Sequence, residues 1–325
     1  MSCLYAQNPS EYTIKELCEL FGVSKQAYYQ YDSDRELRRS SMEEFALEFI
    51  RTTRAKDPGI GGMKMWRMYS SEFSETVHLG RDRFCELLDR NGLKLRRRRR
   101  RPRTTDSTHG NRIYPNLVKS IIPQRIGEVI VGDITYLPLY AKHGAQEAPS
   151  AFCYISLLMD SYCKMVIGYS VGMTLEAIYP IQALTQAIDT LEKYDVNLER
   201  TIHHTDRGVQ YTCGEYIMML RAKNIRISMT QSGNPKDNSE AERLNNTLKN
   251  ELFKDKIFNN IEQVRAALDT AIHFYNHERP HLSLEGRTPY EASHCTCRFK
   301  RGWTSYRENA IDALNEEIPP IEQAV

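Results

Sequence analysis

Three carboxylates that are far apart in the sequence stand at positions where they could share a metal ion. Asp133 and Asp206 each follow an apolar run typical of a buried strand, and both are expected near strand ends. Glu242 lies in the first turn of a segment with helical periodicity. If the two strands are neighbours, the three acids converge, and they then need a cation to stay ionised together. Oxygen ligands select Mg²⁺ or Mn²⁺, and two such ions stabilise the attacking and leaving oxygens of an in-line displacement at phosphorus.

The segment that carries Glu242 is predicted to form a helix with one apolar and one polar face. It begins at Asp237 and Asn238, which are favoured N-cap residues, and its polar face carries Glu242, Asn246 and Lys249. Asn246 and Lys249 are candidate DNA contacts. An outward glutamate is most often a solvated side chain. Here the second acidic strand, the lysine two turns further on and the basic features described below favour a site instead. The apolar face holds Ala241, Leu244, Leu248 and Leu252.

The residues around the acids alternate between strand-like and helical patterns, which predicts an α/β domain with a mixed sheet and flanking helices. Strands are expected over 129–139, 152–159 and 165–171, and the last two are close enough to form an antiparallel hairpin. Polar residues 141–150 are interpreted as a loop, and so are residues 231–236. The pattern further predicts strands before Asp206 and over 225–229, and helices over 175–194, 214–223 and 261–277.

Two small helical units are predicted before this domain. Residues 13–31 read as two short helices joined at Gly22, with Thr13 and Glu16 forming a capping box. This pattern fits a helix-turn-helix whose second helix enters a major groove, and it fits equally a plain helical hairpin used for packing. The predicted division is a helix-turn-helix-like segment (1–40), a second small helical DNA-binding unit (41–95), an arginine-rich linker (96–120), the α/β core (121–295) and a C-terminal tail (296–325).

The second helical unit leads directly into a run of arginines. The unit is expected to contain a helix over 42–56, a break at 57–62 and a last helix that closes at Gly92. Residues 96–103 then hold seven arginines in eight positions, and repulsion between these positive charges should prevent the segment from folding alone. Such a segment can neutralise DNA phosphates, although a solvated spacer or a signal read by another protein has the same composition. The candidate DNA contacts here are Arg96, Arg97, Arg98, Arg99, Arg100, Arg101 and Arg103.

The bulk composition bounds the remaining possibilities. The chain has 325 residues, 41% of them apolar, and a net charge of +2. No apolar run is long enough to cross a bilayer and the start lacks an apolar signal core, so we expect a cytoplasmic protein with reduced thiols and no membrane partner. Zinc at His294-Cys295-Thr296-Cys297 is disfavoured because no second ligand pair stands at suitable spacing. Metal binding by His273, His277 and His281 is likewise disfavoured, because Pro280 prevents the third from continuing the helix. His203 and His204 are more often packed than catalytic at such positions.

These motifs resemble those of the insertion-sequence transposases, specifically the catalytic second-reading-frame type with a retroviral-integrase-like DDE core. The most specific match is the gap of 35 residues between Asp206 and Glu242. The 72 residues between Asp133 and Asp206 are more than family members usually have, and the polar segment 141–150 accounts for the excess. The resemblance covers about residues 10–295. The other matching motifs are Asp133-Ile134-Thr135, His204-Thr205-Asp206-Arg207-Gly208-Val209-Gln210-Tyr211, Asp237-Asn238, Ala241-Glu242, Thr247-Leu248-Lys249-Asn250-Glu251-Leu252, Tyr275-Asn276, Arg279-Pro280-His281 and Thr288-Pro289.

The resemblance implies a ribonuclease H-like fold and a metal-bound triad of Asp133, Asp206 and Glu242. It also implies that Lys249 contacts DNA near the cut, and that the protein exposes a 3′-hydroxyl at element ends and joins it to DNA by transesterification. Two Mg²⁺ or Mn²⁺ ions are expected with DNA bound. The implied partners are double-stranded DNA of element ends and target, further copies of the chain on DNA, and a helix-turn-helix protein from an upstream reading frame. The expected location is the bacterial nucleoid.

Two other functions stay open from the residues alone. In the first, the chain is a DNA-binding regulator whose core is a relic, but the presence of all three acids and Lys249 disfavours decay. In the second, it is a ribonuclease H-type nuclease that hydrolyses RNA–DNA hybrids without joining strands. The predicted DNA-binding units before the core argue against that nuclease.

Overall fold

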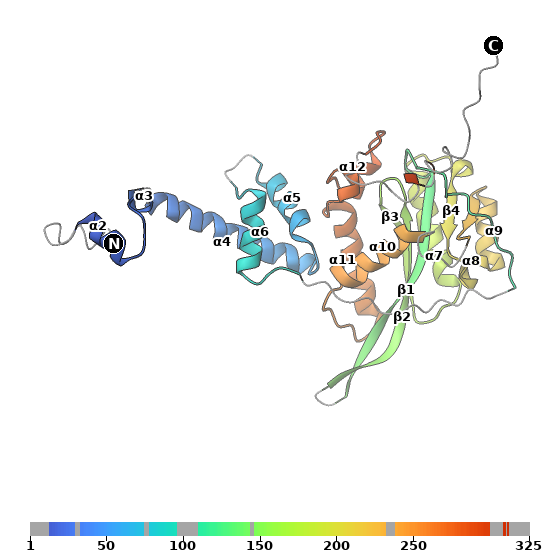
Figure 1. Ribbon diagram of the computed structural model, residues 1–325. Coiled ribbons are helices and arrows are strands. Elements are labelled where there is room, and N and C mark those ends of the chain that lie inside the picture. The colour runs from blue at the N-terminus through green and yellow to red at the C-terminus, as the bar shows by residue number, and fades with distance from the viewer. Residues whose placement is uncertain are drawn as a thin grey trace, which may run out of the picture.

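The centre of the molecule is a five-stranded mixed sheet in the order β3-β2-β1-β4-β5 (Figure 1). In this computed structural model the described residues are 13–29, 33–74, 78–95, 110–143, 146–231, 238–299, 308–309 and 311. Neighbours among the first three strands pair antiparallel, whereas β4 runs parallel to β1 and β5 parallel to β4. This topology confirms the predicted mixed sheet of a ribonuclease H-like fold. The strands are β1 (Val129–His143), β2 (Gln146–Asp160), β3 (Val166–Gly172), β4 (Ile202–Thr205) and β5 (Arg226–Met229).

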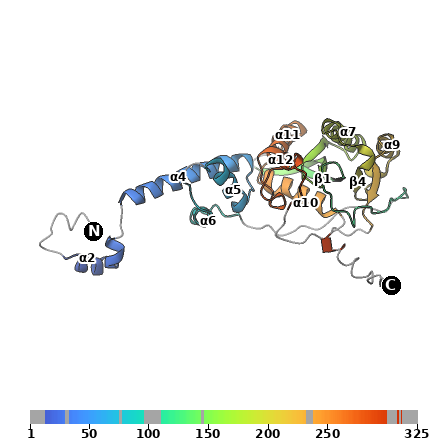
Figure 2. The ribbon, with the colours of Figure 1, turned by 90° about the horizontal axis from the view of Figure 1, so that it is seen from above.

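Helices cover both faces of this sheet, which explains why its strands read as nearly continuous apolar runs. Val129 and Val131 enter one buried cluster, and Ile130 between them enters the other. Helices α10 and α11 pack on the first face, and α7 and α9 on the second (Figure 2). These helices are α7 (Ile178–Lys193), α9 (Gly214–Ala222), α10 (Ser239–Thr247) and α11 (Ile261–His277). Shorter elements are η1 (Leu198–Arg200), α8 (Val209–Thr212), the π-helix η3 (Leu248–Leu252), η4 (Leu282–Leu284) and α12 (Pro289–Ser293).

The contact of α7 with β3 depends on a residue without a side chain. A Cβ atom at Gly168 would lie 2.1 Å from the carbonyl oxygen of Ala183 and 3.0 Å from the Cβ of Ala187. We therefore expect Gly168→Ala to push α7 off the sheet and lower the free energy of unfolding by about 1–3 kcal/mol. Urea unfolding measures this loss. Gly214→Ala is the matched control, because its Cβ would meet no atom within 4 Å, and equal losses in both variants would contradict the packing account.

The structure corrects the predicted loop over residues 141–150. The backbones of β1 and β2 stay paired as far as His143 opposite Gln146, with a bulge at Leu139/Tyr140. The resulting hairpin projects beyond the sheet (Figure 1). Leu139 is buried, whereas Tyr140 and Ala141 after it are only partly buried, so the strand leaves the core at this point. Outside the core no apolar alternation is required, and the polar composition was therefore misinterpreted as a loop.

The helical front of the chain is built largely as predicted. The capping box at Thr13 is present, and Gly22 has the positive φ of +64° that ends the first helix. The helix predicted over 42–56 instead begins at Ser33, so the predicted division at residue 40 lies inside it. Residues 33–41 contain one apolar side chain, Leu37, and this explains why periodicity missed them. The helices are α2 (Ile14–Leu20), α3 (Lys25–Tyr29), α4 (Ser33–Lys56), α5 (Gly62–Glu72) and α6 (Arg81–Arg90).

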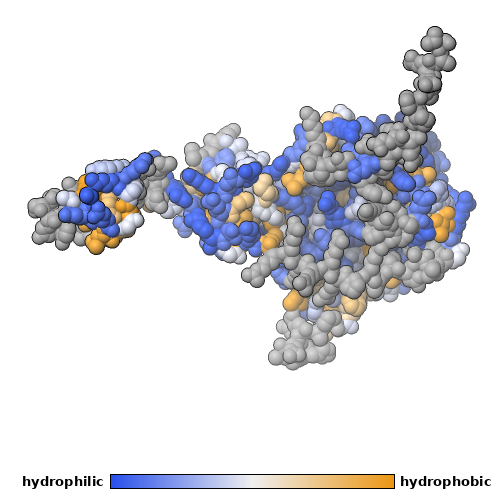
Figure 3. Space-filling model, viewed as in Figure 1, coloured by the Kyte–Doolittle hydropathy of each residue, from blue (hydrophilic) through white to orange (hydrophobic). Residues whose placement is uncertain are grey.

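The described residues form a largely polar surface and contain no disulfide bond. The face seen in Figure 3 is mainly hydrophilic over the described part of the chain. Within that part, no helix combines the length and apolar character needed to cross a membrane. The seven described cysteines are all free. The arginine run 96–103, Cys3 and most of the predicted tail lie outside the described residues.

Candidate active site

The parallel pairing of β1 with β4 brings the first two acids together. Val129 pairs with Ile202 and Val131 with His204, and the same register carried two residues further aligns Asp133 with Asp206. Asp206 follows the end of β4, as predicted. Asp133 was expected near a strand end but lies inside β1, which continues to His143. What ends near Asp133 is the pairing with β4, because that strand is short.

Helix α10 is tied to β1 at this point by two asparagine side chains. The Asn245 amide donates to Oδ2 of Asp133 at 2.7 Å, and the Asn238 amide donates to the Gly132 carbonyl at 3.0 Å. Asn238 is the N-cap residue, as predicted, but its side chain makes no capping hydrogen bond and is used to hold β1. The predicted apolar face of α10 is confirmed, since Ala241, Leu244, Leu248 and Leu252 are buried. Asp237 and residues 232–236 lie outside the described residues.

Glu242 and Glu240 both lie in the first turn of α10, but their charges act on different groups. Glu240 forms an ion pair with Lys164 at 2.9 Å, on the connection between β2 and β3. Glu242 is half-buried, and its charge raises the pKa of Asp133. The two glutamates therefore have different surroundings although they are two residues apart.

The three acids interact electrostatically. Burial raises the pKa of Asp133 to about 7, the Asp206 carboxylate adds to this rise, and so does Glu242. Hydrogen bonds from the Ile134 backbone and the Asn245 amide oppose it. A carboxyl group with such a pKa is only partly ionised at neutral pH, and a bound cation would favour its ionised form.

The acids nevertheless make other contacts in this structure. Oδ1 of Asp206 accepts the Gly208 backbone N–H at 2.9 Å, and Oδ1 of Asp133 accepts the N–H of Ile134 at 2.9 Å. Among the described residues, no group of three His, Cys, Asp or Glu side chains is arranged to hold a metal ion. The carboxylates are thus gathered, but they are not arranged as a ligand set.

The chemistry of the surrounding oxygens fits a hard, hydrated cation. Oδ1 of Asn245, Oδ1 of Asn238 and the Tyr211 hydroxyl are buried and have no hydrogen-bond partner within the described ranges. Burial raises the pKa of Tyr211 well above its ordinary value, and the nearby Tyr216, Asp133 and Asp206 add to this effect. Buried oxygens normally find partners. Mg²⁺ and Mn²⁺ prefer oxygen ligands and retain water, so both ions suit this donor set.

Lys249 lies beside the acids on an element that the sequence did not reveal. After Thr247 the helix widens into the π-helix η3, which carries Lys249. The Lys249 ammonium lies 4.2 Å from the ring centroid of Tyr136 on β1. Burial lowers the pKa of Lys249, and the charge of Asp133 acts in the opposite direction. Asn246, the other candidate DNA contact, is exposed and accepts a hydrogen bond from Asn250 at 2.7 Å.

The two histidines before Asp206 have structural roles, as the sequence favoured. His203 and His204 are buried in β4. His203 contacts the Tyr216 hydroxyl at 2.7 Å, and His204 contacts the Ser228 hydroxyl at 2.8 Å. Burial lowers the pKa of His203 to about 3. An imidazole held neutral inside the sheet supports the strand on which Asp206 depends.

Among the described residues, neither His273, His277 and His281 nor the cysteines near the end of the core are arranged to hold a metal ion. The rings of His273 and His277 stack at 4.7 Å, whereas His281 contacts the Arg279 guanidinium at 2.9 Å. The hydroxyl of Tyr162 donates to the backbone carbonyl oxygens of Cys295 and Cys297, which lie near the end of the core. These residues therefore contribute to packing.

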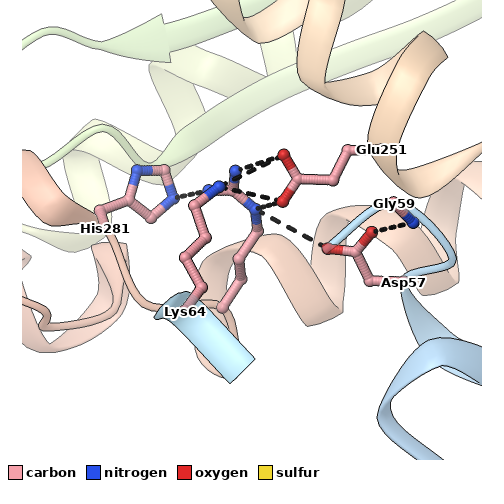
Figure 4. A network of polar contacts seen from close by, with 6 residues as sticks. Asp57, Gly59, Lys64, Glu251 and His281 are labelled. Atoms are coloured by element: carbon pink, nitrogen blue, oxygen red, sulfur yellow. Dashed lines mark hydrogen bonds and ion pairs between the residues drawn. The ribbon is translucent and has the colours of Figure 1, made fainter. Parts of the chain in front are cut away.

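A second cluster of charged groups, missed by the sequence analysis, joins the front helices to the core (Figure 4). The Glu251 carboxylate on η3 accepts two hydrogen bonds from Arg279, at 2.8 and 2.9 Å. Lys64 of α5 donates to the same carboxylate at 3.0 Å. Asp57 is fully buried, and its Oδ2 lies 3.9 Å from Nε of Arg279. We refer to Lys64, Glu251 and Arg279 as the Glu251 clamp.

Asp57 should make stability depend on pH. Burial raises its pKa to about 7, and the Glu251 charge adds to this although Arg279 opposes it. The folded protein then binds more protons than the unfolded chain between about pH 4 and pH 7, so stability falls as pH rises through this range. We expect Asp57→Asn to be more stabilising at pH 8 than at pH 5, by about 1 kcal/mol or more. Urea unfolding at both pH values measures this difference, and a more favourable effect at pH 5 would contradict the assignment.

Comparison with known proteins places this site in a defined class. Two family models, both described as Integrase core domain, match residues 123–235 and 223–289. The chain is 29% identical over 277 residues to the 31 kDa protein of insertion element IS600 from Shigella sonnei, covering 84% of this chain and 96% of that protein. It is 23% identical over 285 residues to the transposase for insertion sequence element IS629 from Shigella sonnei, covering 86% and 90%. The HTLV-2 integrase catalytic core domain in complex with magnesium aligns with 17% identity and a TM-score of 0.38, covering 54% of this chain and 99% of that chain.

The matched residues span the sheet together with α10 and α11, so this part of the chain is an integrase core domain. The relatives align along most of the chain, including the helices before the core. The chain belongs to the insertion-sequence transposases with an integrase-like core, as the sequence motifs implied.

Proposed function

We propose that this protein cuts DNA at the ends of its insertion sequence and joins the exposed 3′-hydroxyl to target DNA by metal-dependent transesterification. The observation that carries the proposal is the parallel pairing of β1 with β4, whose register, carried two residues further, sets Asp133 opposite Asp206. The charges of Asp206 and Glu242 also both raise the pKa of Asp133. In this proposal the three carboxylates hold Mg²⁺ or Mn²⁺, with two ions present when DNA is bound. When bound, the ions supply Lewis-acid activation of the nucleophile and stabilisation of the leaving oxygen.

The remaining residues of the site would bind and orient the DNA. Asn245 fixes the carboxylate of Asp133 through its hydrogen bond. Lys249 would neutralise a phosphate next to the cut, and the exposed Asn246 would add a neutral contact from the neighbouring turn. The arginines at 96–103 would bind backbone phosphates without reading sequence, so binding should weaken steeply with salt.

The wider assignment follows the same proposal. The substrate is double-stranded DNA of the element ends and of the target, which two or more copies of the chain would hold together. The helices before the core, up to about residue 95, would recognise the ends, and the segment 96–120 would link them to the core. A helix-turn-helix protein from an upstream reading frame is the proposed further partner, and the nucleoid the proposed location.

A cleavage and joining assay tests this proposal. The purified chain is incubated with duplex DNA that carries the inverted repeats flanking its gene, with and without Mg²⁺. We expect Mg²⁺-dependent nicks that leave a 3′-hydroxyl, followed by joined products. Binding without cutting would indicate a regulator with a relic core. Hydrolysis of RNA–DNA hybrids without joined products would indicate a ribonuclease H-type nuclease.

A further inference from the structure

The front helices α4–α6 and the integrase core share one buried apolar cluster. Ile50 of α4, Ile60 of the α4–α5 turn and Met65 of α5 belong to the same cluster as Leu252 and Phe274 of the core. Figures 1 and 2 both place the end of α4 next to α10 and α11. The front unit, by which we mean α4–α6 and the turns that join them, is therefore packed directly against the core.

The closest approach is a backbone contact between the α4–α5 turn and η3. The Gly59 N–H donates to the Glu251 carbonyl at 2.8 Å. A Cβ atom at Gly59 would lie 2.2 Å from Cα of Glu251 and 2.7 Å from the Asn250 carbonyl oxygen. Backbone atoms cannot rotate away as a flexible side chain can, so any side chain at Gly59 must separate the two elements. Gly61, two residues later, has no atom within 4 Å of its Cβ position.

The side chains of the Glu251 clamp hold the same two elements together. Exposed side-chain fractions are 20% for Lys64, 15% for Glu251 and 4% for Arg279, so the three charges are largely removed from water. Buried ion pairs add little net stability, but the loss of one partner leaves an uncompensated charge. The bidentate Arg279–Glu251 pair also fixes orientation. The clamp thus specifies how the front unit is seated on η3.

The element held in this way is the one that presents Lys249. Lys249 and Glu251 belong to the same five-residue π-helix, which directly follows α10. On its other side η3 holds the Lys249 ammonium over Tyr136 of β1. π-helical turns are rare, and they occur mostly as single turns inside α-helices, frequently at functional sites. The front unit contacts this π-helix through the backbone of Gly59 and the side chain of Lys64.

We propose that the docking of α4–α6 through Gly59 and the Glu251 clamp is a positioning device for Lys249. The front unit would then contribute to DNA cleavage through the geometry of η3, apart from any DNA it binds itself. Gly59, Lys64 and Glu251 are positioning residues in this proposal, because they would affect cleavage only by holding η3, and with it Lys249, in place. The inference rests on the proposed role of Lys249 at the DNA phosphate.

Two glycine variants test the device. Gly59→Ala should lower the Mg²⁺-dependent cleavage rate at saturating DNA about 10- to 100-fold per folded molecule, whereas Gly61→Ala should stay within about twofold. Because Gly59 is expected to act through Lys249, the two effects should not multiply. Gly59→Ala added to Lys249→Ala should therefore cost much less than it costs alone. Equal rates for the two glycine variants, or effects that multiply fully, would overturn the inference.

A second pair of variants serves if Gly59→Ala does not fold. Lys64→Met removes one arm of the clamp, and its control Lys56→Met removes the exposed pair with Glu278 at 2.6 Å. Hydrogen exchange of residues 248–252 should be faster in Lys64→Met than in Lys56→Met, whether or not the protein cuts DNA. Equal exchange would overturn the docking device. Faster exchange in a protein that cuts no DNA would support docking and count against the proposed function instead.

Discussion

Asp206→Asn is expected to lower the rate of metal-dependent DNA cleavage about 10³-fold or more. Asparagine keeps the shape of the side chain and can still accept the hydrogen bond from Gly208 with its amide oxygen. What it removes is the negative charge that, with Asp133 and Glu242, would attract divalent ions. Cleavage of duplex element ends in Mg²⁺ measures the loss, and the corresponding substitutions Asp133→Asn and Glu242→Gln should give losses of similar size.

The control for this prediction is Asp189→Asn, which removes an exposed carboxylate from α7. Its rate should match that of the unsubstituted protein. DNA binding by Asp206→Asn should be retained, and its metal-free form should be no less stable, because one of three mutually repelling charges has gone. Full activity in Asp206→Asn would mean that the chemistry lies elsewhere in the chain.

Asn245→Ala is expected to lower the same rate about 10- to 100-fold. Its amide holds Oδ2 of Asp133 at 2.7 Å, so its loss frees a carboxylate that must be oriented to bind metal. Because orientation and not charge is lost, the Mg²⁺ concentration for half-maximal rate should rise as well. Asn245→Asp should be more damaging, since a fourth carboxylate would add to the repulsion that already raises the pKa of Asp133.

A titration of cleavage rate against Mg²⁺ separates these cases. For Asn245→Ala, high Mg²⁺ should recover part of the rate, whereas for Asp206→Asn it should not. A rate and Mg²⁺ dependence unchanged in Asn245→Ala would show that the hydrogen bond to Asp133 has no part in metal binding.

The features predicted correctly from the sequence are those marked by burial and spacing. The apolar runs before Asp133 and Asp206 predicted strands because both faces of this sheet are covered. The apolar face of α10 followed from its period, whereas the role of Glu242 in the site rests on the resemblance and stays a prediction. The sequence could not predict that the strands carrying Asp133 and preceding Asp206 are neighbours, because packing of the whole domain sets the strand order.

The features that the sequence did not reveal depend on contacts between distant elements. Residues 141–143 pair with residues 146–148 beyond the core, where no apolar pattern is required. Asn238 matches an N-cap residue by type, yet its amide is used by Gly132 on a strand more than a hundred positions earlier. Glu251 meets Lys64 and Arg279 from two other parts of the chain. No local signal in the sequence identifies such partners.

The central claim is that Asp133, Asp206 and Glu242 share divalent cations. A crystal structure of the protein with element-end DNA and Mn²⁺ tests it most directly, because anomalous scattering locates the ions. We predict Mn²⁺ between Asp133 and Asp206, within about 2.0–2.2 Å of their carboxylate oxygens, with Glu242 completing the site as the scissile phosphate is engaged. Mn²⁺ bound elsewhere, with the three carboxylates still apart from one another and from the scissile phosphate, would contradict the account.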